Sequence, residues 1–166
     1  HALTRNKRDF DRLAAELQKT TKIFCPDIIG RGESDWLKDP SLYSYPQYVS
    51  DMVAMIARMD AQSVDWVGTS MGGIIGMLTA AQPNSPIRRL VLNDVGPFLP
   101  LAAIKRIGDY VGNQPTFKTR ADLEQYLRMI YAPFGIKQDK DWQNLFQSST
   151  RILADGQFSL NYDPAI

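Results

Sequence analysis

Ser70 is the residue whose surroundings most clearly indicate chemistry, because it stands in Gly68-Thr69-Ser70-Met71-Gly72. This G-x-S-x-G pattern is typical of a nucleophile elbow, a sharp strand-to-helix turn that exposes a serine hydroxyl. Glycine is favoured two residues to either side, since a side chain there would collide with the neighbouring strand or helix. We predict that Ser70 attacks a carbonyl carbon. The simpler alternative is a glycine-rich turn that only allows close packing.

The elbow lies between an apolar strand, residues 63–67, and a helix of small and apolar residues, 74–81. A helix that begins at the serine directs its first free N–H groups toward the group that the serine attacks. Such N–H groups can stabilise the negative charge that develops on the carbonyl oxygen. The local pattern therefore predicts a nucleophile and part of an oxyanion hole together.

Helical and strand patterns alternate up to Pro97. Apolar residues at helical spacing predict helices over 10–17, 46–59 and 74–81, and short apolar runs predict strands over 22–26, 63–67 and 89–94. Asn6 is a candidate cap for the first helix. This alternation predicts an α/β fold with a parallel sheet and right-handed crossovers.

After Pro97 the pattern becomes helical and aromatic. Three helices are expected: one marked by apolar residues 101–111, one capped by Thr119, and one capped by Asp139 with Ile152 on its apolar side. We divide the chain into a partial core, residues 1–97, and a helical cap, residues 98–166. Some cap aromatics should line an apolar pocket over Ser70, and the others should be core.

Composition excludes several classes of protein. The 166 residues carry a net charge of +1 without a block of like charge, so nothing indicates a nucleic-acid or membrane partner. A single cysteine, Cys25, excludes a disulfide within the chain and fits a reducing, cytoplasmic compartment. No metal cluster or organic cofactor motif is visible. Gly30-Arg31-Gly32 leaves a nucleotide-binding module as an alternative, although the fingerprint glycine and the P-loop lysine are missing.

These motifs in this order resemble the α/β-hydrolase fold family, in particular its capped bacterial serine hydrolases. The resemblance rests on His1-Ala2-Leu3, on Pro26-Asp27 with Gly30, Gly32 and Ser34, on the elbow, and on residues 90–97 that lead into the cap. It implies Ser70 as the nucleophile and the N–H groups of Leu3 and Met71 as the oxyanion hole. Ala2 departs from the usual glycine of that loop. His1 corresponds to the histidine that shapes the loop, not to the catalytic base.

The resemblance also shows what this sequence does not contain. In this family an acid and then a histidine follow the serine, but His1 is the only histidine here. A central strand would end just before His1 and lie between the 22–26 and 63–67 strands. We therefore expect a fragment of a longer hydrolase that neither closes a normal core nor catalyses by itself. Asp94 at a strand end is either an acid, as in some relatives, or a turn residue before Gly96.

Several functions stay open at this stage. The first is a serine hydrolase that acts on an ester or thioester of a small apolar acyl substrate through an acyl-enzyme. Carbon–carbon bond hydrolysis and acyl transfer use the same serine site. A non-catalytic short form that binds a ligand or partner is the alternative of a different class. Serine at the elbow argues against dehalogenase and epoxide-hydrolase chemistry, which on this fold use a carboxylate.

Overall fold

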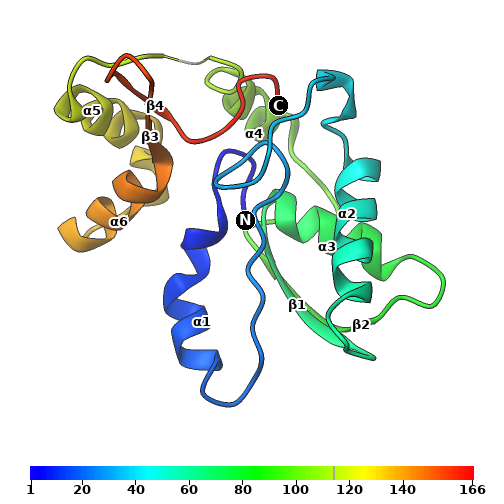
Figure 1. Cartoon of the computed structure of the whole chain (residues 1–166). Coiled ribbons are helices and arrows are strands. Elements are labelled where there is room, and N and C mark those ends of the chain that lie inside the picture. Colours follow the sequence, from blue (N-terminus) through cyan, green and yellow to red (C-terminus); the bar gives the residue numbers. More distant parts are fainter. Residues whose placement is uncertain (114) are drawn as a thin grey trace.

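A parallel pair of strands carries the predicted elbow. In the computed structural model, which describes residues 1–113 and 115–166, β1 (Val64–Thr69) pairs with β2 (Ile87–Asn93). The register places Thr69 opposite Asn93, so both strands end at the same edge. α3 (Met71–Ala80) connects the two strands and packs on both of them and on α2 (Tyr45–Ala57). This arrangement is the α/β architecture expected from the alternating pattern (Figure 1).

The remaining elements lie before the sheet and in the cap. The other helices are α1 (Asp11–Leu17), α4 (Leu101–Gly108), α5 (Arg120–Ile130) and α6 (Asp139–Ser149), with 3-10 turns η1 (Lys7–Phe10), η2 (Pro40–Leu42) and η3 (Ala132–Phe134). β3 (Thr150–Ile152) and β4 (Phe158–Leu160) form an antiparallel hairpin. Within the two described stretches, every helix is too short or too polar to cross a membrane.

Buried apolar side chains form two clusters. One lies beneath the elbow and consists of Ile28, Tyr48, Met52, Met71 and Ile75. The other joins α5, α6 and the hairpin, and consists of Leu123, Leu127, Tyr131, Trp142, Leu145, Phe146, Leu160 and Tyr162. Figure 1 shows the second cluster's elements, in yellow to red, set apart from the β1–α3–β2 unit. The N-terminal loop therefore runs between two separately packed regions.

Of the three predicted caps, Thr119 caps α5, whereas Asn6 caps the 3-10 turn η1 that precedes α1, and the N-cap of α1 itself is Phe10. The Asn6 side chain accepts a hydrogen bond from the N–H of Arg8, and the Thr119 hydroxyl accepts one from the N–H of Asp122 at 3.2 Å. Asp139, expected as a cap, is instead the first helical residue after Gln138. The prediction was also wrong at the other end, since α6 stops at Ser149. Ile152 lies on β3 and is 70% exposed.

The strand predicted over 22–26 was wrong. This segment has no regular secondary structure and pairs with neither of the two described sheets. A cavity of about 610 Å³ lies between it, α1, α2 and β1. Leu13, Leu17 and Phe24 on its walls remain at least 40% exposed. An extended apolar segment becomes a strand only when a neighbouring backbone satisfies its N–H and C=O groups.

Candidate active site

The backbone of Ser70 has an unusual conformation. Its φ is +50° and its ψ is −116°, a combination that residues other than glycine rarely adopt. The N–H of Ser70 donates to the carbonyl oxygen of Asn93 at 2.9 Å, and its own carbonyl accepts from Gly73 at 2.8 Å and Ile74 at 3.1 Å. β2 and the first turn of α3 therefore hold the serine in this turn from both sides.

Close packing explains the glycines around the serine. A Cβ on Gly68 would overlap the backbone of Gly72, and a Cβ on Gly72 would lie 2.8 Å from the main-chain nitrogen of His1. A Cβ on Gly73 would overlap the side chain of Val95. The turn is thus compressed against strand, helix and N-terminal loop at once, as the motif predicts.

His1 anchors the N-terminal loop and is not placed as a base. One ring nitrogen, Nε2, accepts a hydrogen bond from the N–H of Ile28 at 2.9 Å. The other, Nδ1, lies 2.9 Å from the carbonyl oxygen of Ala2 and therefore carries the proton. The ring is buried, and the main-chain carbonyl of His1 accepts from the N–H of Gly72 at 3.0 Å. The loop is thus fastened both to the elbow and to residue 28.

The two N–H groups expected to form the oxyanion hole have no protein acceptor. Neither the N–H of Leu3 nor that of Met71 donates a hydrogen bond to any residue that the structure describes. Leu3 packs against the apolar cluster that contains Met71. Ala2 fits where the family has glycine, and its carbonyl accepts from Arg5 at 3.1 Å. Met71 directly follows Ser70, and Leu3 lines the same cavity as Ser70, so both N–H groups are suited to bind an oxygen atom there.

Ser70 opens onto a cavity of about 1220 Å³ between the core and the cap. Of the cap aromatics, Tyr110, Tyr131 and Phe134 line it. Tyr131 also belongs to the buried cap cluster, together with Trp142 and Phe146, and Tyr126 packs against that cluster. Sequence reasoning predicted an apolar pocket without assigning individual residues, but most residues that line this cavity are polar or charged, among them Arg8, Arg12 and Asp141. Phe98 takes neither role and is 79% exposed.

Asp94 lies on the wall of the same cavity, directly after β2. Its φ is +55°, which suits a turn residue. Its side chain makes no hydrogen bond or ion pair with the described residues, and both of its proposed roles therefore stay open.

The Gly30-Arg31-Gly32 loop is built for packing. The N–H groups of residues 30, 31 and 32 donate to Asp35, Ile28 and Asn161, so none of the three is left to hold a phosphate. In return, the N–H of Asp163 donates to the carbonyl of Gly30 at 2.7 Å. The carboxylate of Asp27 accepts from the N–H groups of Lys7 and Glu33 and thereby ties down its own loop. These contacts argue against the nucleotide-binding alternative.

Arg31 is the residue that sequence reasoning missed. Its side chain is fully buried and donates to the carbonyl oxygens of Leu3 at 2.9 Å and Ile29 at 2.7 Å, and to the hydroxyl of Tyr48 at 2.9 Å. The only signal for it was an arginine between two glycines. That pattern does not show that the side chain folds back onto the loop carrying Leu3.

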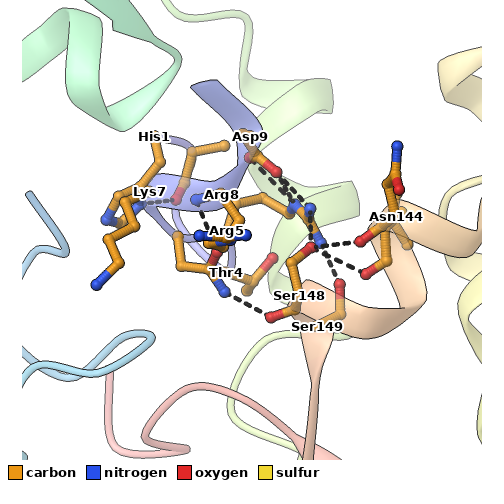
Figure 2. Close-up of polar contacts among 12 residues, drawn as sticks. His1, Thr4, Arg5, Lys7, Arg8, Asp9, Asn144, Ser148 and Ser149 are labelled. Carbon is orange, nitrogen blue, oxygen red and sulfur yellow. Dashed lines mark hydrogen bonds and ion pairs between the residues drawn. The ribbon is translucent and has the colours of Figure 1, made fainter. Parts of the chain in front are cut away.

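The N-terminal loop also binds the cap (Figure 2). Arg5 is buried, pairs with Asp9, and donates to the hydroxyls of Ser149 and, at 3.0 Å, Ser148. Asn6 donates to the carbonyl oxygen of Ser148 at 2.6 Å. The C-terminal end of α6 is therefore fixed to the loop that also carries Leu3.

Comparisons with known proteins agree with this geometry. Residues 1–134 match the family described as alpha/beta hydrolase fold, so the chain belongs to that family. A 3-hydroxybutyrate-oligomer hydrolase from Cupriavidus necator is 47% identical over the whole chain, which spans 58% of that relative.

Solved structures give the same result. A hydrolase described as putative from Rickettsia typhi is 40% identical, with a TM-score of 0.94 over all of this chain and 59% of that one. An alpha/beta hydrolase from Novosphingobium aromaticivorans is 34% identical, with a TM-score of 0.91 over 99% of this chain and 58% of that one. The arrangement of the elements described here is therefore that of known hydrolases.

Proposed function

We propose that the complete protein carrying this chain is a serine hydrolase that cleaves an ester or thioester of a small apolar acyl substrate. The observation that carries this proposal is the position of Ser70. It stands on a strained turn, opens onto a large cavity, and has the unpaired N–H groups of Leu3 and Met71 nearby. Nucleophile and oxyanion donors in this relation are the parts that acyl transfer requires.

The reaction follows from these parts. The Ser70 hydroxyl oxygen attacks the carbonyl carbon while its proton passes to a histidine base, and the carbonyl oxygen becomes an oxyanion bound by Leu3 and Met71. Collapse of this intermediate releases the alcohol or thiol, which takes the proton, and leaves Ser70 acylated. Water then repeats the sequence and releases the acid. Both ring nitrogens of His1 are engaged, so the base must come from outside these 166 residues.

The substrate class is suggested by the Cupriavidus necator relative. Its name describes hydrolysis of 3-hydroxybutyrate oligomers, which are linear esters of a short hydroxy acid. We therefore propose short hydroxyacyl oligoesters as the first substrates to test.

Carbon–carbon bond hydrolysis is a second candidate. A 2-hydroxymuconate semialdehyde hydrolase from Pseudomonas is 26% identical over 137 residues, and the same serine site could serve that reaction. Acyl transfer would need only an alcohol in place of water as the acceptor of the acyl group. A non-catalytic short form would keep the cavity without turnover.

The test uses the complete protein with 3-hydroxybutyrate dimer and trimer, a butyryl thioester, an aryl butyrate and a vinylogous diketone acid. Hydrolysis of the oligoesters, lost in Ser70→Ala and kept in Ser63→Ala, supports the proposal. Ser63 is an exposed serine away from the elbow and serves as the matched control. Cleavage of the diketone acid alone would favour the second candidate. No Ser70-dependent turnover of any substrate would favour a binding role.

A further inference from the structure

Arg31 carries a buried charge that no acid neutralises. Its side chain is 0% exposed, and among the described residues no carboxylate oxygen lies within 4.0 Å of its guanidinium. Arg5, the other buried arginine near the site, pairs directly with Asp9. Burying an unpaired cation is costly unless other groups solvate it. An arginine kept in this state therefore calls for an explanation beyond packing.

The same guanidinium touches both residues of the proposed oxyanion hole. Its Nε donates to the carbonyl oxygen of Leu3 at 2.9 Å, and its Nη2 lies 3.6 Å from the sulfur of Met71. Leu3 and Met71 are the residues whose main-chain N–H groups lack a protein acceptor. One planar, rigid cation thus spans the loop on one side of the hole and the helix start on the other.

These contacts constrain where the Leu3 N–H points. On one side of it, the carbonyl of His1 is held by the N–H of Gly72 at 3.0 Å. On the other side, the carbonyl of Leu3 is held by Arg31. The Leu3 N–H itself shares a planar peptide unit with the carbonyl of Ala2, which accepts from the N–H of Arg5 at 3.1 Å. With this unit and the units on both sides of it held, the N–H has little rotational freedom. Preorganised donors of this kind stabilise an oxyanion without reorganisation cost during the reaction.

Aromatic groups hold the charge in place without cancelling it. The guanidinium lies 5.1 Å from the ring centre of Tyr48 and 5.8 Å from that of Tyr43. Tyr43 in turn donates its hydroxyl to Asp163 at 2.5 Å, so this carboxylate meets the tyrosine and not the arginine. The positive charge therefore remains available in a dry interior, where it acts over several ångströms.

We propose that Arg31 is the positioning residue of the oxyanion hole, fixing the Leu3 N–H and adding its positive charge to the field that the oxyanion meets. This inference rests on the proposed function of Ser70. It assigns a task to the Gly30-Arg31-Gly32 loop beyond closing a turn. Gly30 and Gly32 adopt positive φ values on either side of Arg31, and a Cβ there would overlap the side chains of Tyr43 and Asp27.

The test compares Arg31→Met, Arg31→Lys and Tyr48→Phe in the complete protein. The readouts are kcat and KM for an aryl butyrate, the inhibition constant of an aryl trifluoromethyl ketone, and Tm. The ketone forms a serine adduct that carries an oxyanion, so its affinity reports the hole directly. Tyr48→Phe removes one partner of Arg31 but leaves its contacts with Leu3 and Met71 intact.

We expect Arg31→Met to lower kcat about 100-fold, with KM changed less than about threefold. The inhibition constant of the ketone should rise by a similar factor, about 100-fold. Arg31→Lys keeps the positive charge but lacks the planar guanidinium, so its kcat should lie between those of Arg31→Met and wild type. Tyr48→Phe removes only the hydroxyl that Arg31 donates to, and it should lower kcat by less than Arg31→Lys does. Folded Arg31→Met with wild-type kcat and ketone affinity would overturn the proposal.

If Arg31→Met does not fold, Arg31→Lys decides the question. A kcat at least about tenfold lower at unchanged KM supports a positioning role, and a wild-type kcat refutes it. Ser70→Ala distinguishes failure of the proposed function from failure of the inference about Arg31. Ester turnover that survives in Ser70→Ala would remove the proposed function, whereas Ser70-dependent turnover insensitive to Arg31 would remove only this inference.

Discussion

The N–H of Gly72 donates a 3.0 Å hydrogen bond to the carbonyl oxygen of His1, and the turn that carries Ser70 is thereby tied to the loop that carries Leu3. The contact leaves no room for a side chain, because a Cβ on Gly72 would meet the backbone of His1 at 2.8 Å. The geometry of the Ser70 turn and that of the Leu3 loop are therefore set by one another.

Gly72→Ala should separate the elbow from the loop. We expect a loss of roughly 1–3 kcal/mol in the free energy of unfolding, since backbone atoms must shift. Activity should fall about 100-fold, because displacement of catalytic groups by about 1 Å has that effect. Urea unfolding and ester turnover of the complete protein measure both.

Gly108→Ala on α4 is the control, since its Cβ would meet nothing within 4 Å, and it should stabilise by about 0.5–1 kcal/mol. Equal behaviour of the two variants would contradict the prediction.

Ser70→Gly should be inactive but more stable than wild type. The serine has a φ of +50°, which glycine adopts without strain. We expect Ser70→Gly to abolish turnover and raise the free energy of unfolding by about 1 kcal/mol, after allowance for the greater freedom of glycine in the unfolded chain. Ser70→Ala keeps the strain, and so it should be inactive with a stability within about 0.5 kcal/mol of wild type. Chemical denaturation of all three proteins gives the comparison, and a glycine variant less stable than the alanine variant would refute the idea of a strained turn.

Arg5 and Arg12 both link the N-terminal segment to α6, but Arg5 is buried and Arg12 is exposed. Arg5→Met removes buried, charge-assisted hydrogen bonds and should cost about 2–3 kcal/mol, and it should speed hydrogen exchange in the last turn of α6. Arg12 makes an exposed ion pair with Asp141 at 3.4 Å, so Arg12→Met should cost less than about 1 kcal/mol. Similar losses in the two variants would mean that the buried contacts with Ser148 and Ser149 do not hold the cap.

Stability should fall at high pH through Tyr43. Burial, together with its hydrogen bond to Asp163, raises the pKa of Tyr43 to about 12 from an ordinary value of 10.0. The neutral phenol is thus favoured in the folded state, and this contribution is fully present below pH 10 and is lost as the pH rises toward 12. Tyr43→Phe should show a shallower loss between pH 10 and 12 in urea titrations. An unchanged slope would show that the Tyr43 phenol is not protected in the folded protein.

The elbow could be predicted because its determinants are local. Gly68, Ser70 and Gly72 specify one turn between a strand and a helix, and the structure has that turn. The strand predicted over 22–26 failed because pairing depends on a neighbouring backbone, which periodicity does not show. The β3–β4 hairpin was missed because three-residue strands are too short to establish an alternating pattern. Arg31 was missed as a site residue because its partners lie far from it along the chain.

Asn161 and Asp163 bond to Gly32 and Gly30, and this pairing has a consequence for the order of synthesis. The elbow and its two strands need only residues 64 to 93, so they can form while the chain is still emerging from the ribosome. The loop that holds Arg31 gains these two bonds only once residue 163 has been made, and such distant contacts form late. A growing polypeptide would thus form the Ser70 turn before residues 161 and 163 are available to close the loop that carries Arg31.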